Sequence, residues 1–418
     1  MFYLSRSAEQ AARVYAHADA LNALQQAAAF LERLPTDAAH ERTALELMLR
    51  EAQSLYFLGR FRESVERLEP HERRVDQLAE PSFSGSYHFW LGHMYARLGD
   101  RERAARHAQR AIDEATRAGD EATLGKAHGV LAVEAYWLGR PQQGIAHAQQ
   151  AITLLDRTGE TWWRAMAHFY LGMNALLGGR FRLGLDSAEW TRELGEGLDD
   201  RRLQSYGLFL MGWLHATRGE PAIAIEECER SLSLAADSVN ACYATGLLGY
   251  ACLENGNRAR AISLLEHSVR ELERFDFRQW QGWFTTLLAD AELCHGRVEV
   301  ARELAHRGLA IADSAGFRAA IGWARHILGR AALAQGVLDG ADQELSEAIR
   351  IFGAIDAPFE QARVQLDLAA LARARGAVDV AAQHLRAALH AFAELQIPVW
   401  AERTYQLAAE LGISLTSS

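Results

Sequence analysis

Apolar residues recur along the chain in stretches of helical periodicity, and each stretch is closed by a glycine. These glycines stand forty residues apart, with one step of thirty-seven, at Gly59, Gly99, Gly139, Gly179, Gly219, Gly256, Gly296, Gly336 and Gly376. A glycine between a leucine-rich stretch and a charged or proline-marked restart is typical of a helix C-cap, where a positive φ is favoured. The pattern therefore predicts a repeated unit of two helices joined by a tight turn, with Pro141 and Pro221 in the first turn of a second helix.

Two columns of small residues keep the same register as the glycines. Seven residues before each glycine the chain has alanine or glycine, and five residues after it most units again have one of the two, as Gly92 and Ala104 do around Gly99. Small side chains at fixed positions allow two helices to cross closely. The sequence therefore predicts helix pairs with a close crossing in every unit.

The register extends over the whole chain, so we expect a single repeat domain over residues 1–418. Residues 1–40 are predicted to form a degenerate first unit, with Asp19 at its turn and Ala12 at its small position. Residues 41–397 are predicted to form nine regular units, and residues 398–418 a capping helix and tail.

Two irregularities carry local predictions. Pro70 falls late in the second helix of its unit and should end or kink that helix near Leu68, because proline lacks the amide hydrogen that the helix needs. The thirty-seven-residue step predicts a shortened loop around residues 235–240.

Segments such as FWLGHMYARLGDRERAARHAQRAI (89–112) and WARHILGRAALAQGVLDGADQELSEAI (323–349) resemble the tetratricopeptide repeat in their leucine, glycine and alanine positions. The resemblance implies an all-α fold: a right-handed α-solenoid of about ten helix-turn-helix units with a C-terminal capping helix. The forty-residue period and the opening segment 6–35 also resemble the repeat arrays attached to bacterial signalling ATPases, cyclases and the maltose-regulon activator. This resemblance implies the regulatory part of a bacterial signalling or transcription-regulating system.

Charge and cysteine content narrow the partners and the compartment. The 54 acidic residues outnumber the 44 basic ones, so the formal net charge is −10 and nucleic acid is not an expected partner. The four cysteines show no CxxC spacing, which favours a reduced cytoplasmic chain over a disulfide framework or a zinc site. No apolar run approaches the ~18 residues of a membrane span, so no membrane partner is expected.

In the tetratricopeptide family the first helix of each unit lines the concave side. The resemblance implies that positions thirteen, ten, six, three and two residues before each turn glycine face this side. Aromatic residues are enriched there over their 9% share of the whole chain. The candidate ligand-binding residues of this face that are aromatic or methionine are Phe89, Tyr136, Trp137, Met166, Phe169, Met173, Tyr206, Phe209, Trp213, Tyr243, Tyr250, Trp283 and Trp323.

Polar members of the same face, His93, Lys126, Asp290, His326 and Arg330, are expected to orient the ligand. We interpret the face as an aromatic-lined groove for a peptide or protein segment, because tryptophan and tyrosine offer large rigid contact areas with wet polar tips. The alternative is that longer helices or a narrow superhelix bury these side chains as ordinary core. Two further hypotheses are a small-molecule sensor, for example for a sugar stacked on the rings, and self-association through the ends of the stack.

Catalytic and cofactor chemistry is not expected. His88, His128 and His168 share one column, but helices pack 8–10 Å apart, too far for equivalent residues of successive units to share an ion at ~2 Å. Gly125-Lys126 lacks the other residues of a phosphate loop, and the sequence contains no HExxH, GxSxG or GxGxxG. We therefore expect a chain that is not an enzyme and has no catalytic residue, metal or cofactor.

Overall fold

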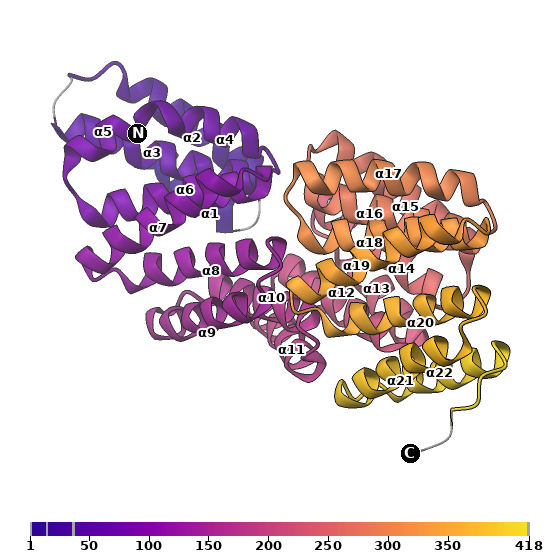
Figure 1. Ribbon diagram of the computed structural model, residues 1–418. Coiled ribbons are helices and arrows are strands. Elements are labelled where there is room, and N and C mark those ends of the chain that lie inside the picture. The colour runs from indigo at the N-terminus through magenta and orange to yellow at the C-terminus, as the bar shows by residue number, and fades with distance from the viewer. Residues whose placement is uncertain (1, 14–15, 36–37, 416–418) are drawn as a thin grey trace. The chain divides into compact units, whose positions relative to one another are not determined.

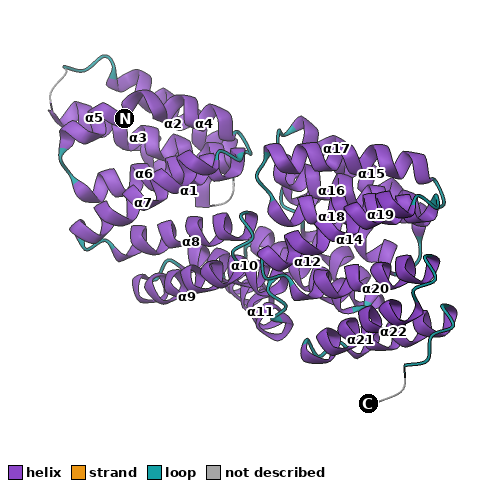
Figure 2. Cartoon of the chain, in the orientation of Figure 1, coloured by secondary structure: helices purple, strands orange, loops and turns teal. Residues whose placement is uncertain are grey.

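The computed structural model describes residues 2–13, 16–35 and 38–415, and throughout these ranges the regular structure is helical, with no strand (Figures 1 and 2). Consecutive helices are joined by short turns and pack as pairs, so the chain is an all-α solenoid of helix-turn-helix units. None of the helices in these ranges combines the length and the apolar character that a bilayer crossing requires.

The chain divides into two compact units. The N-terminal unit comprises Met1–Glu134 and Gln150–Glu160, and the C-terminal unit comprises Ala135–Gln149 and Thr161–Ser418. That residues 1–418 form one continuous repeat domain stays a prediction.

The helices of the N-terminal unit are α1 (Phe2–Arg13), α2 (His17–Leu31), α3 (Ala38–Phe57), α4 (Phe61–Leu68), the 3-10 helix η1 (Glu69–His71), α5 (Glu72–Leu78), α6 (Pro81–Leu98), α7 (Arg101–Ala118) and most of α8 (Glu121–Trp137). Helix α9 (Pro141–Thr158) is shared between the two units. The C-terminal unit adds α10 (Thr161–Leu177), α11 (Phe181–Gly197), α12 (Arg201–Arg218), α13 (Pro221–Leu234), α14 (Ser238–Glu254), α15 (Arg258–Arg274), α16 (Arg278–Cys294), α17 (Val298–Ser314), α18 (Arg318–Ala334), α19 (Leu338–Ala354), α20 (Pro358–Ala374), α21 (Val378–Glu394) and α22 (Pro398–Glu410).

The predicted turn glycines are confirmed, since all nine have a positive φ, between 68° at Gly139 and 88° at Gly296. A second column of left-handed residues ends the second helix of many units. Its members stand forty residues apart except across α13, and only some of them are glycine: Ala79, Gly119, Gly159, Asp199, Asp276, Gly316, Asp356 and Gln396. Both turns of the unit therefore use a left-handed residue, and the second was hidden in the sequence by its mixed composition.

The close helix crossings are confirmed as well. A Cβ placed on Gly92 would lie 3.0 Å from the backbone nitrogen of Ala108 and 3.2 Å from the carbonyl oxygen of Ala104. A Cβ on Gly212 would lie 3.1 Å from the carbonyl oxygen of Ala224. The small residue of the first helix thus faces the small residue of the second, as the two columns predict.

The local predictions had mixed outcomes. Helix α4 ends at Leu68 and a 3-10 turn containing Pro70 follows, as predicted. The shortened loop is wrong: the linker 235–237 has the same length as the linker 275–277, and helix α13 is shortened instead, to 14 residues against 17 in α15. Asp19 is not at a turn but in the first turn of α2, where a carboxylate suits the helix N-terminus.

Within the C-terminal unit, contacts join helices that are distant in the sequence, such as the end of α8 and the start of α18. A Cβ on Gly139, after α8, would lie 2.7 Å from Cβ of Ile355 and 3.3 Å from Cβ of Arg318, at the start of α18. The contact recurs forty residues on, where a Cβ on Gly179 would lie 2.9 Å from Cγ of Pro358, the first residue of α20. The unit therefore winds back on itself, and its successive turns are in contact.

The third contact of this series joins α12 to α22. Trp400 Nε1 donates a hydrogen bond to the carbonyl oxygen of Thr217 at 2.8 Å, and a Cβ on Gly219 would lie 2.8 Å from Cγ1 of Val399. Helix α22, predicted as the cap of the stack, thus packs against the first helix of an earlier unit.

Candidate binding pocket in the C-terminal unit

Aromatic side chains fill the interior of the C-terminal unit. The rings of Trp213 and Trp283 have centroids 4.3 Å apart, and those of Trp283 and Trp323 are 5.5 Å apart. Trp137 meets Phe317 of a later turn at 4.7 Å. Tilted and edge-on rings at these distances form a packed core.

The expectation of an open, wet aromatic lining is therefore wrong for the C-terminal unit. The predicted residue Trp323 is partly buried. The other predicted rings and methionines of this unit are buried, because the unit is wound tightly enough for successive turns to touch: Tyr136, Trp137, Met166, Phe169, Met173, Tyr206, Phe209, Trp213, Tyr243, Tyr250 and Trp283. That some of these residues contact a ligand stays a prediction.

Three predicted residues lie in the N-terminal unit. Phe89 and His93 are buried and stack on each other with centroids 5.7 Å apart, and His93 also packs on Tyr56. Lys126 Nζ forms an ion pair with Glu160 at 3.0 Å. These side chains therefore do not belong to the aromatic interior of the C-terminal unit.

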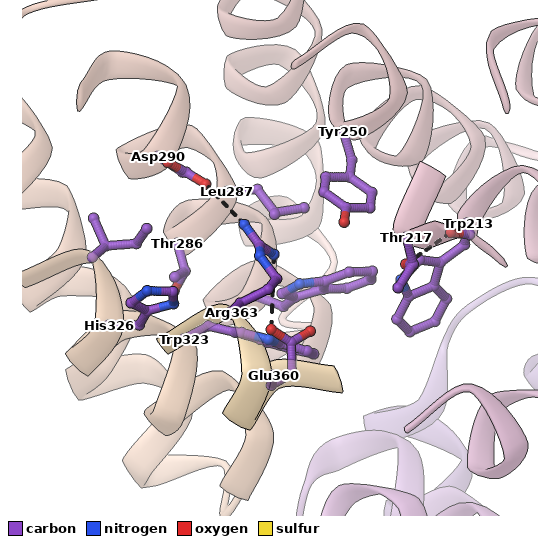
Figure 3. A pocket seen from close by; sticks show the side chains of 12 residues that line it. Trp213, Thr217, Tyr250, Thr286, Leu287, Asp290, Trp323, His326, Glu360 and Arg363 are labelled. Carbon is purple, nitrogen blue, oxygen red and sulfur yellow. Dashed lines mark hydrogen bonds and ion pairs between the residues drawn. The ribbon is translucent and has the colours of Figure 1, made fainter. Parts of the chain in front are cut away.

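A small cavity of about 30 Å³ remains inside the aromatic interior of the C-terminal unit (Figure 3). Such a volume holds one water molecule or a few. Most of its lining residues occupy the inward positions that the repeat register implies, on α12, α14, α16, α18 and α20: Trp213, Thr217, Tyr250, Trp283, Thr286, Asp290, Trp323, His326 and Arg363, joined by Leu287, Ile327 and Glu360. We call it the inner cavity.

A larger pocket of about 380 Å³ adjoins the inner cavity and shares Asp290, His326 and Arg363 with it. We call it the outer pocket. It is richer in charge than the inner cavity, and its other lining residues are Leu253, Glu254, Gly256, Arg258, Cys294, Arg330, Leu366, Asp367, Trp400, Arg403 and Leu407.

A buried acid and two partly buried arginines join the inner cavity to the outer pocket. Arg330 Nη1 donates a hydrogen bond to Asp290 at 2.5 Å, and Arg363 Nη2 lies 4.0 Å from the other oxygen of the same carboxylate. Burial raises the pKa of Asp290, but the charges of Arg330 and Arg363 together outweigh burial and bring that pKa below its ordinary value. Asp290 is therefore ionised at neutral pH. That it orients a ligand stays a prediction.

His326 belongs to the same network. Its Nε2 lies 2.6 Å from a carboxylate oxygen of Asp367. Burial raises the pKa of Asp367, while its hydrogen bond with His326 and the charges of His326 and Arg330 lower that pKa below its ordinary value. The structure thus brings together Asp290, His326 and Arg330, three of the five polar residues predicted from the sequence.

Glu360 is the least satisfied acid of the inner cavity. Among the described residues, no hydrogen-bond donor reaches its Oε2, and Nη1 of Arg363 is 3.7 Å away. Burial raises the pKa of Glu360, and the charge of Arg363 and a hydrogen bond from Trp323 offset this only in part. Figure 3 shows its carboxylate beside Trp323 and Arg363 in the inner cavity. A buried acceptor without a donor is costly, so Oε2 of Glu360 offers a docking point for a donor group or a water molecule.

Helix α22 forms one wall of the outer pocket. The guanidinium of Arg403 lies over the ring of Trp400 at 4.5 Å and pairs with Glu254 of α14 at 3.2 Å. The guanidinium of Arg363 also faces the Trp400 ring, at 5.4 Å. The pocket is therefore completed by a helix that is distant in sequence from its other walls.

Sequence reasoning missed several of these residues. Arg363 is thirteen residues before Gly376, at an inward position of the register, but the enrichment that singles out this face is one of aromatic side chains and does not point to an arginine. Glu360 lies outside the register. Trp400 and Arg403 reach the pocket only through the contact between turns of the solenoid, which no local pattern encodes.

The chain resembles several solved structures in fold. It is similar to a Rap protein complexed with Competence and Sporulation Factor, with a TM-score of 0.50 and 14% identity over 94% of this chain and 98% of that one. It is also similar to the apo form of RapI (TM-score 0.40, 11% identity, 94% and 98% covered) and to the APC/C hetero-tetramer Cut9-Hcn1 (0.43, 12%, 95% and 88%). No family model and no curated protein matches the sequence. The chain thus has the fold of tetratricopeptide-like helical repeat proteins.

Proposed function

We propose that the chain is a non-catalytic regulatory module whose C-terminal unit binds a segment of a peptide or partner protein in the outer pocket. One observation carries the proposal: the partly buried side chains of Arg330 and Arg363 converge on the buried carboxylate of Asp290 in a pocket beside the aromatic interior. Burying charges is costly, and a packed apolar core would be easier to form. A concave site with a few convergent polar groups is the usual form of a ligand pocket.

The inner cavity sets the chemistry of the group that enters deepest. Glu360 offers an acceptor, and the rings of Trp213, Trp283 and Trp323 offer flat apolar faces. A side chain or terminus of the segment that carries N–H groups satisfies Glu360 and displaces the water that otherwise fills so small a space. The similarity in fold to a protein crystallised with Competence and Sporulation Factor is compatible with a peptide ligand and does not identify one.

Occupancy is coupled to the shape of the unit through α22. The ligand touches Trp400 and Arg403 of this helix as well as Glu254 of α14, so it contacts both sides of the seam where the solenoid closes. A ligand that binds one arrangement of this seam more tightly than another shifts the population between them. The module would report binding in this way.

The test is a screen of a random peptide library against the full chain, followed by titration of the best binder with tryptophan fluorescence as readout. Glu360→Gln and Asp290→Asn should weaken binding at least tenfold, because each removes a charge that the ligand meets. Asp339→Asn is the matched control, since this side chain is fully exposed on α19 and should leave the affinity unchanged. A screen without binders, or a binder insensitive to the first two variants, would contradict the proposal.

A small-molecule effector is the second candidate, because about 380 Å³ lies within the range of roughly 300–1,000 Å³ that is usual for small-ligand sites. A metabolite panel that includes sugars, read by the same fluorescence, separates the two. A response to a metabolite that the Glu360→Gln variant loses, together with an empty peptide screen, would favour the small molecule.

A further inference from the structure

Outside the pocket, three side chains that can bind metal ions converge in the N-terminal unit. Glu72 begins α5, His88 lies within α6 and His107 lies within α7. One ligand atom of each lies within 4.8 Å of the ligand atoms of the other two. The packing of α6 on α7, and the 3-10 turn that ends α4 and starts α5, thus bring together two imidazoles and a carboxylate.

The two imidazoles already have the spacing of ligands on one ion. Their Nδ1 atoms are 2.9 Å apart. Two nitrogens bound to one zinc ion at 2.0–2.1 Å with tetrahedral angles lie about 3.3 Å apart, so a shift of a few tenths of an ångström admits the ion. His88 and His107 are buried, and the ring of Tyr95 stacks on His107 with centroids 5.6 Å apart. The rings are therefore held in place by packing.

One proton lies between the two imidazoles, because their Nδ1 atoms share a hydrogen bond. A neutral imidazole carries its proton on either ring nitrogen, so moving this proton to Nε2 of its ring frees both Nδ1 atoms for an ion. Glu72 is partly exposed and connects the buried pair to solvent, and one of its oxygens accepts a hydrogen bond from Arg110 at 3.1 Å.

We propose that Glu72, His88 and His107 form a binding site for a divalent transition-metal ion, with Zn²⁺ as its representative. Two histidines and one glutamate, with water at an open fourth position, are an established zinc ligand set, and imidazole favours the metals from cobalt to zinc. The ion would join α5, α6 and α7. The site is independent of the pocket in the C-terminal unit and of the function proposed for it.

The repeat register excludes a metal shared by His88, His128 and His168 of successive units, and this site is a different one. The partner of His88 is His107, from the second helix of the same unit, nineteen residues on. Paired helices of one unit cross more closely than equivalent positions of successive units, so two ligands meet there.

The experiment titrates the chelator-treated full chain with Zn²⁺ against a chromophoric competitor, with Co²⁺ absorption as a second readout of histidine coordination. We expect one tightly bound ion per chain. His107→Phe should lower the affinity at least tenfold and Glu72→Gln several-fold. His168→Phe is the matched control: His168 shares the column of His88 but lies in the C-terminal unit, and its removal should change nothing.

A variant of Arg110 separates a metal site from a merely structural cluster. Its guanidinium holds Glu72 and repels a cation, so Arg110→Gln should tighten Zn²⁺ binding, whereas loss of packing would not. Glu72 and Arg110 are both more than one-third exposed, so these two variants decide the matter even if His107→Phe does not fold. Zinc uptake that is absent, or equal in Glu72→Gln and the unchanged chain, would overturn the proposal.

Discussion

Replacing Gly139 by alanine tests whether the C-terminal unit closes on itself. The variant carries two costs. At a φ of +68°, an alanine at this position is strained by about 1–2 kcal/mol, as any L-residue with a side chain would be. Its Cβ would also crowd Ile355 and Arg318 of the next turn, and overpacking of this kind costs about 1–3 kcal/mol more.

Gly336→Ala is the matched control, because Gly336 belongs to the same column, has a φ of +73°, and a Cβ added to it would meet no other atom within 4 Å. It should lose only the stability that the backbone strain costs, about 1–2 kcal/mol. Gly139→Ala should therefore lose about 1–3 kcal/mol more than its control in the free energy of unfolding.

Urea unfolding followed by far-UV circular dichroism and tryptophan fluorescence measures this difference, provided that the slope is the same for both variants. Combining Gly139→Ala with Ile355→Ala should cost less than the sum of the two single changes, because Ile355→Ala removes Cγ2, the atom of Ile355 nearest to the added Cβ. Equal losses for Gly139→Ala and Gly336→Ala, within about 0.5 kcal/mol, would show that the turns are not in contact.

Two other predictions concern the seam and the buried histidines. Trp400→Ala should lower the free energy of unfolding in urea by about 3–5 kcal/mol, since Trp400 is buried and donates a hydrogen bond to Thr217. Tyr405→Ala, on the exposed side of the same helix, should lower it by less than about 0.5 kcal/mol. Similar losses for the two variants would contradict the docking of α22. In the presence of chelator, the free energy of unfolding should fall as the pH falls from 6.5 towards 4. The folded pKa values of His88 and His107, about 3 and about 4, lie below the ordinary 6.5, so the unfolded chain takes up protons first. An unchanged dependence of stability on acid pH in a variant with phenylalanine at both positions would refute this.

The elements of the fold could be predicted because their signals are local. A glycine such as Gly99 ends a helix through its own φ. Gly92 allows α6 to cross closely over α7, the next helix in the sequence. The sequence assigns the three-residue deletion to a loop, whereas the structure shows that helix α13 is the shorter element. The two cases give the same spacing of glycines in the sequence.

The site could be predicted only in part. The repeat register correctly indicates that Trp213, Trp283 and Asp290 point inward, since this depends on the phase of a single helix. Whether such residues line an open groove or a closed core depends on how tightly the units wind. That quantity follows from contacts such as Gly139 with Ile355, which are remote in sequence and leave no periodic trace. Trp400 was out of reach for the same reason.

The most direct test of the closed winding is a cross-link between turns. Gln142 Nε2 donates a hydrogen bond to Asp356 at 3.1 Å, across the seam, and Gln142 Oε1 accepts one from Arg180 of the neighbouring unit at 2.7 Å. Cysteines placed at 142 and 356 should be joined within one chain by a short bismaleimide, as efficiently as cysteines at 142 and 180, with the linked peptides identified by mass spectrometry. A cross-link at 142 and 180 without one at 142 and 356 would contradict the account, because any open solenoid of these repeats would give that result.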